Sequence, residues 1–111
     1  MPQQPDMATP ILKRSVVIAG RKTSISLEEP FWRALQAIAR RRAIEIGQLV
    51  RVITDAPRGN NVSSDARCFI VEQLQAERDA AIAVAQGNAS EADRQLFRLI
   101  IHARQQEAAD A

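Results

Sequence analysis

The chain has few of the residues that build metal centres, disulfides and catalytic sites. Its 111 residues include one cysteine, one histidine and no tyrosine. The lone Cys68 excludes an internal disulfide and any cysteine-based metal cluster. His102 has no second histidine with which to complete a metal site, and no acid, base and nucleophile converge in the sequence. We therefore expect no enzyme, no catalytic residues, no metal and no cofactor.

Aromatic residues and long apolar runs are also scarce. Aromatics make up 4% of the chain, which leaves few large side chains for the core of one small domain. A symmetric homodimer would relieve that shortage. No apolar run approaches the roughly 18 residues of a membrane span, and the beginning lacks the basic and apolar stretches of a signal peptide. We therefore expect a cytoplasmic homodimer with no membrane attachment.

The net charge of +2 conceals an uneven distribution along the chain. Ten Lys or Arg against four acids give residues 11–60 a charge of +6, whereas five Arg against eight acids give residues 61–111 a charge of −3. Thirteen of the fifteen basic residues are arginine, which makes forked contacts to phosphate and guanine. The amino-terminal half is thus the candidate for binding a polyanion such as double-stranded DNA.

The only convincing strand region runs from Arg14 to Leu27, is rich in β-branched residues and contains Gly20 near its middle. In its second half, residues 22–27, apolar and polar side chains alternate, so one face is polar. The first half, residues 14–18, leaves three alternatives open. It extends the ribbon, it pairs with residues 22–27 through a turn at Ala19-Gly20, or it becomes ordered only on binding.

In the rest of the chain, apolar residues recur at steps of three and four residues, which predicts four helices. Ser26 with Glu29 predicts a capping box for a first helix that ends near Arg42, and a second helix runs from Ile46 to the residue before Pro57. Residues 58–61 predict a polar turn. A third helix, capped by Ser63 or Ser64, continues to about residue 85 and is ended by Gly87-Asn88. A fourth begins after Ser90.

A functional role is conceivable for three side chains in these helices, Trp32, Cys68 and His102, and we favour a structural role for each. Trp32 lies at the margin of the helix face on which Phe31 points to the core, and we expect it to be partly buried by packing. Cys68 is expected to be a small buried thiol. His102 is expected to be a boundary side chain.

The segment Thr23-Ser-Ile-Ser-Leu-Glu28, running into Phe31-Trp-Arg-Ala-Leu35, resembles the opening of a ribbon-helix-helix domain family of short bacterial proteins. The likeness continues in shorter pieces and covers roughly Lys13 to Leu74. These pieces are Ile38-Ala39, Gln48-Leu-Val50, Gly59-Asn-Asn-Val-Ser-Ser64, Ala66-Arg67 and Phe69-Ile70. The expected organisation is a flexible arm (1–12), a ribbon-helix-helix domain (13–75) and a carboxy-terminal helical extension (76–111).

The resemblance implies a mostly helical fold with a short amino-terminal β-ribbon, in which strands of two chains pair antiparallel above a shared helical core. Such ribbons enter the major groove of DNA. Ile25 and Leu27 would then face the dimer core. Lys22, Ser24 and Ser26 would face the base edges, where Lys22 donates to guanine. We therefore predict a DNA-binding transcription regulator.

In this family the beginning of the second helix anchors a phosphate through free backbone N–H groups. Here that position is Glu45, Ile46 and Gly47, although the Glu45 carboxylate would repel phosphate. Arg21, Arg41 and Arg42 are further candidates for phosphate contact.

A rival hypothesis is a dimeric protein-interaction module that docks a protein partner through its last helix, as an antitoxin docks its toxin. The apolar stripe of the last helix motivates this alternative. It consists of Leu96, Phe97, Ile100 and Ile101.

Overall fold

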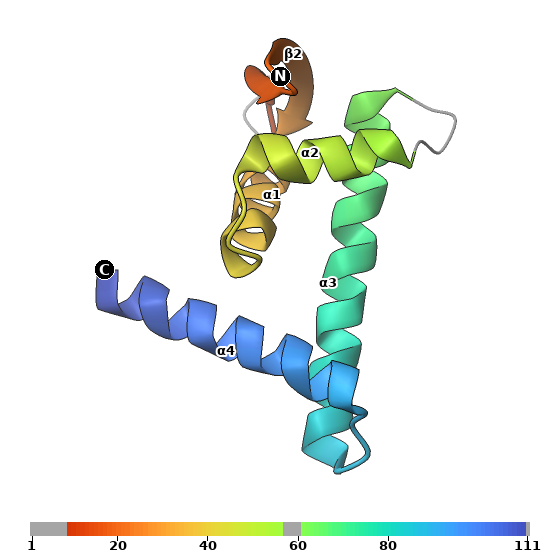
Figure 1. Cartoon of the computed structure of the whole chain (residues 1–111), viewed down its shortest axis with the longest axis vertical. Coiled ribbons are helices and arrows are strands. Elements are labelled where there is room, and N and C mark those ends of the chain that lie inside the picture. Colours follow the sequence, from red (N-terminus) through yellow and green to blue (C-terminus); the bar gives the residue numbers. More distant parts are fainter. Residues whose placement is uncertain (1–8, 57–60, 111) are drawn as a thin grey trace, which may run out of the picture.

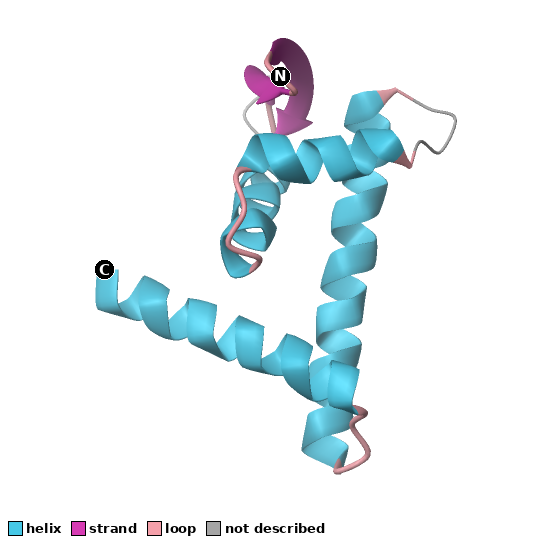
Figure 2. Ribbon diagram, in the orientation of Figure 1, coloured by secondary structure: helices cyan, strands magenta, loops and turns pink. Residues whose placement is uncertain are grey.

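A computed structural model describes residues 9–56 and 61–110 of the chain (Figures 1 and 2). Two strands are followed by four helices, and the helices dominate the fold. The elements are β1 (Ile11–Ile18), β2 (Arg21–Glu28), α1 (Glu29–Arg41), α2 (Ile46–Asp55), α3 (Val62–Gln86) and α4 (Glu91–Asp110). The ribbon lies at one end of the molecule, and α3 leads from that end to the crossing with α4 (Figure 1).

The two strands form an antiparallel hairpin within one chain, with Ile11 opposite Glu28 and Ile18 opposite Arg21. Of the three alternatives for residues 14–18, the structure therefore has the turn at Ala19-Gly20. Both turn residues have positive φ, 51° and 79°, as a tight turn between twisted strands requires. The ribbon pairs two strands of the same chain, whereas the family resemblance implied strands from two chains. β1 also begins at Ile11, inside the segment expected to be an arm.

Helix α1 begins directly after β2, and its start differs from the sequence prediction. Ser26 lies inside β2, so it does not cap the helix; Glu28 occupies the cap position without a side-chain cap hydrogen bond. Pro30 is tolerated in the first turn because its missing N–H has no helical partner there. At the other end, Ile44 N donates to Ala39 O and Ala43 N to Arg40 O, which closes the helix with Ala43 in the left-handed region.

The core of the domain lies between the inner face of the ribbon and helices α1, α2 and α3. Trp32 is the fully buried aromatic of α1, 1% exposed, and its Nε1 donates to Leu12 O at 2.9 Å. Phe31, which was expected in the core, is only half-buried. The other large buried side chains come from all four of these elements. They are Ile25, Leu27, Leu35, Ile38, Leu49, Val50 and Ile70.

Helix α3 starts at a cap that the sequence analysis assigned to the wrong residue. The Asn61 side chain accepts a hydrogen bond from Ser64 N at 2.8 Å, so neither Ser63 nor Ser64 is the cap. The helix then runs 25 residues and closes at Gly87, φ 74°, as the Gly87-Asn88 pair predicted. The expected domain boundary at residue 75 falls inside α3, which passes it without a break.

The carboxy-terminal extension packs α4 across the far half of α3. Small residues are buried on both helices, Ala80 on α3 and Ala103 on α4. Ser90 Oγ accepts from Asp93 N at 3.1 Å and Asp93 Oδ2 from Ser90 N at 3.0 Å, which confirms the predicted start at Ser90. Residues 1–8 of the expected arm, and residues 58–60 of the expected polar turn, lie outside the described residues.

Candidate nucleic-acid interface

The ribbon presents one polar face away from the helices, which we call the outer face. Paired residues of an antiparallel ladder point to the same side of the sheet, so the register determines which side chains share it. Lys22 pairs with Val17, Ser24 with Ser15 and Ser26 with Lys13. The outer face therefore includes Lys13, Ser15, Val17, Lys22, Ser24 and Ser26. The Ile11–Glu28 pair continues it at the end of the ribbon that adjoins α1.

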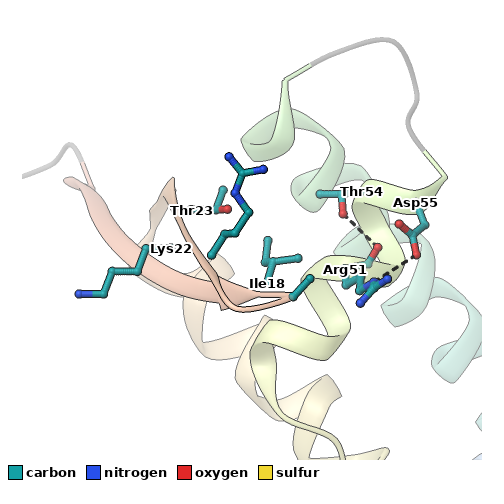
Figure 3. A pocket seen from close by; sticks show the side chains of 8 residues that line it. Ile18, Lys22, Thr23, Arg51, Thr54 and Asp55 are labelled. Atoms are coloured by element: carbon teal, nitrogen blue, oxygen red, sulfur yellow. Dashed lines mark hydrogen bonds and ion pairs between the residues drawn. The ribbon is translucent and has the colours of Figure 1, made fainter.

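Two of the three residues that the sequence assigned to base contacts are fully available on this face. Lys22 and Ser24 are exposed, while Ile25 and Leu27, further along the same strand, are 1% and 0% exposed. The inward and outward alternation of β2 was therefore predicted correctly. Figure 3 shows Lys22 directed away from α2.

The exposed outer-face residues of β1 were not predicted from the sequence. They are Ile11, Lys13, Ser15 and Val17, on a strand whose pairing the sequence left open. The signal that finds them is the Ala19-Gly20 turn, because a hairpin closed there puts Ser15 opposite Ser24. Lys13 and Lys22 lie about 13 Å apart along the ribbon, given 3.4 Å per residue.

Ser26 also belongs to the outer face, but α3 holds its backbone. Ser26 N donates to Ser63 Oγ at 3.1 Å, and Arg67 reaches Ser26 O at 3.5 Å. Arg67 also pairs with Glu28 at 3.0 Å. Hydrogen bonds from the Glu28 backbone amide and from Arg67 lower the pKa of the Glu28 carboxyl. This end of the β2 edge is thus occupied by helix α3 of the same chain.

The beginning of α2, the expected phosphate anchor, lies against β1. A side chain at Gly47 would overlap the carbonyl oxygen of Val17, and Ile46 packs against the core. Glu45 occupies the cap position, where its N–H donates to Gln48 Oε1 at 2.8 Å. The role of Glu45, Ile46 and Gly47 as a phosphate anchor stays a prediction, and the close approach to β1 narrows the space for a ligand.

Arg41 and Arg42 lie at the end of α1 that is remote from the ribbon (Figure 1). The Arg41 guanidinium forms a bidentate ion pair with Glu77 of α3, at 2.7 to 3.0 Å, and its side chain is only 14% exposed. Arg42 donates to the side chain of Gln73. Both residues tie α1 to α3, so the structure does not bring them together with Arg21, Lys22 and the outer face.

The other two residues with reactive side chains, Cys68 and His102, lie on different helices, α3 and α4. Cys68 is exposed, contrary to the expectation of a buried thiol, because the core-facing residues of this part of α3 are Ala66, Phe69 and Ile70. His102 is exposed on α4. Within residues 9–56 and 61–110, no group of three His, Cys, Asp or Glu side chains is arranged to hold a metal ion. The described helices include none with the length and apolarity to cross a membrane.

Fold and surface together define a small domain in which a β-ribbon with an exposed polar face stands on a helical core. The chain belongs to the ribbon-helix-helix domain family, which matches residues 11–74 and thus more than half of its length. Domains of this family are generally DNA-binding transcription regulators or antitoxins and are typically not enzymes. No curated protein and no solved structure matches the chain.

Proposed function

We propose that this protein is a cytoplasmic transcription regulator that inserts its β-ribbon into the major groove of double-stranded DNA. The observation that carries the proposal is the exposed outer face, where Lys13, Ser15, Lys22 and Ser24 stand on a rigid hairpin. A two-stranded ribbon fits a major groove about 12 Å wide and 8.5 Å deep. Because the inner face is buried on the helices, the outer face is the side on which the ribbon can meet DNA.

Each side chain of the outer face has a partner among the base edges. The Lys13 and Lys22 ammonium groups donate to guanine O6 or N7, and the hydroxyls of Ser15 and Ser24 donate or accept. Val17, 58% exposed between them, supplies an apolar contact to a thymine methyl group. Neither lysine has an ion-pair partner among the described residues, so binding DNA breaks no ion pair of theirs within that part of the chain.

The proposed regulator is a homodimer, in keeping with its family. Its ribbon is complete within one chain, and Ser63 and Arg67 occupy the β2 edge at Ser26. A partner strand would have to displace them to pair along that part of the edge. We therefore place the dimer contact on α3, where Val71 and Leu74 are 46% and 43% exposed beside Cys68.

The test is a fluorescence-anisotropy titration of labelled duplexes, first selected from genomic fragments by the purified full-length protein. Lys22→Ala and Lys13→Ala are expected to weaken binding to the selected duplex by about 1–3 kcal/mol each and to relax the preferred sequence. Arg98→Ala is the matched control, because it removes the same charge from an exposed side chain on α4, outside the ribbon. Unchanged affinity in both lysine variants would contradict the ribbon contact.

A second candidate function is the protein-interaction module, and exposed apolar side chains on α4 favour it. Leu99 and Ile101 are 46% and 39% exposed, whereas Leu96, Phe97 and Ile100 are half-buried. Only part of the predicted stripe is thus available to a protein partner. A wild-type protein that selects no DNA fragment at low salt would favour this function over the first.

A further inference from the structure

A second cationic surface adjoins the ribbon on its inner side. A cleft of about 460 Å³ lies between the hairpin turn and the carboxy-terminal half of α2. The strand contributes Arg21, Lys22 and Thr23, and the helix contributes Arg51, Thr54 and Asp55 (Figure 3). The cleft is open to solvent and was not anticipated from the sequence, because Arg21 and Arg51 are 30 residues apart.

The register of the hairpin separates the roles of two adjacent basic residues. Arg21 pairs with Ile18 and therefore shares the inner side with Thr23, while Lys22 pairs with Val17 on the outer face. Both residues line the cleft, but the Lys22 side chain extends away from α2 (Figure 3). Arg21 makes no ion pair within the part of the chain that the structure describes, so its guanidinium is available to an anion.

Arg51 is held only weakly by its own chain. Its Nε lies 3.8 Å from Asp55 Oδ2, and the two side chains are 58% and 71% exposed. An exposed pair at that distance contributes little, since water and salt screen it. A bound phosphate would offer Arg51 a shorter, charge-assisted hydrogen bond. Thr23 Oγ1 adds a neutral donor, whereas the Thr54 hydroxyl already donates to Arg51 O at 3.0 Å.

We propose that Arg21 and Arg51 form a clamp for one backbone phosphodiester of the DNA whose groove the ribbon occupies. The inference rests on the proposed function and adds a positioning contact that the outer face lacks. A ribbon in the groove brings the surfaces beside its turn close to the sugar-phosphate backbone, and phosphate contacts determine the register of a protein on its duplex. Asp55 acts against the clamp, because its carboxylate competes with phosphate for Arg51.

The experiment measures affinity for one labelled duplex over a series of salt concentrations, using the full-length protein. Arg21→Gln and Arg51→Gln are each expected to weaken binding by the same factor for every DNA sequence, while the slope of log K against log salt changes little because the remaining arginine still neutralises the phosphate. The double variant is expected to reduce the slope by about 0.9, because both residues hold the same phosphate. Asp55→Asn is expected to tighten binding.

The controls separate this inference from the proposed function. Arg98→Gln removes an equal charge on α4 and is expected to leave the slope unchanged, and circular dichroism verifies that each variant is folded. If the wild type binds and Lys22→Ala weakens it while the Arg21 and Arg51 variants do not, the clamp is overturned and the ribbon contact stands. A slope loss of about 1.8 in the double variant would overturn the shared phosphate. A wild type that binds no duplex would overturn both.

Discussion

At the scale of single residues, the alternation of side chains along β2 separates the exposed outer face from the buried core. Lys22 and Ser24 point outward, and Thr23 and Ile25, which alternate with them, point inward, because successive side chains of a strand leave on opposite sides. A shift of the register by one residue would bury Lys22 and expose Ile25. The buried residues of the core therefore hold the outer face in position.

Gly47 is the residue at which the backbone of α2 approaches the ribbon most closely. A Cβ there would overlap the Val17 carbonyl oxygen, which belongs to backbone and cannot rotate away. We expect Gly47→Ala to lower the free energy of unfolding by about 1–3 kcal/mol, although alanine is otherwise the better helix former. Urea denaturation measures this loss.

The matched control for Gly47→Ala is Val52→Ala, which changes an exposed side chain of the same helix. We expect it to change stability by less than about 0.5 kcal/mol. A Gly47→Ala protein as stable as the wild type would show that the contact between α2 and β1 is looser than described.

At the scale of elements, the hairpin depends on a turn whose first residue is not the preferred one. Ala19 adopts φ 51°, a conformation that costs an L-residue with a Cβ roughly 1–2 kcal/mol. Asn-Gly is the favoured pair at such a turn. We expect Ala19→Asn to raise the free energy of unfolding by about 1 kcal/mol, measured by thermal and urea denaturation.

Ala43 offers the control for this substitution, because it has φ 56° at the end of α1, away from the ribbon. We expect Ala43→Asn to stabilise the protein by a similar amount. Ala19→Val should destabilise it, since a β-branched side chain tolerates positive φ poorly. A destabilised Ala19→Asn variant would contradict the turn described.

At the scale of the whole molecule, α3 connects the ribbon domain to the extension. Its first half packs on the ribbon through Ser63 and Arg67, and its second half carries the buried Ala80 and packs on α4. Ion pairs to α1 tie both parts of the extension to the domain, with Arg41 bound to Glu77 and Arg40 to Glu107.

The dimer proposed on α3 predicts a mass of two chains in size-exclusion chromatography with light scattering. Leu74→Glu is expected to give a single-chain mass, because a buried, unpaired carboxylate in each half of the contact is costly. Val52→Glu, on exposed α2, should leave the dimer intact. A single-chain mass for the wild type, or inter-chain nuclear Overhauser contacts between β2 strands, would contradict the proposed interface.

The helices and the alternation of β2 could be predicted from local patterns. Spacing of apolar residues located all four helices, and Ser90 and Gly87 marked boundaries that the structure confirms. The caps at Ser26 and at Ser63 or Ser64 were predicted wrongly, because the pattern of a serine near a helix start does not fix where the helix begins. The chain is still extended at Ser26, whereas α3 has already begun at Val62, before both Ser63 and Ser64. Ser26 remains in β2, and the Ser63 hydroxyl accepts a hydrogen bond from the backbone N–H of Ser26.

The candidate site was predicted in part, and the missing part depends on contacts between distant residues. Lys22 and Ser24 followed from alternation within one strand. Lys13 and Ser15 required the pairing of β1 with β2, and the cleft of Arg21 and Arg51 required the packing of α2 beneath the turn. Local patterns carry no information on which of several compatible partners a strand or helix meets.

The sequence by itself determined the order of the elements, the family and the polarity of β2, because these depend on neighbours within a few residues along the chain. Only the tertiary structure decided that the ribbon closes within one chain, that Arg41 is engaged by Glu77, and that Arg21 and Arg51 line one cleft. The physical reason is that side-chain packing selects among pairings that the local chemistry of the backbone permits equally.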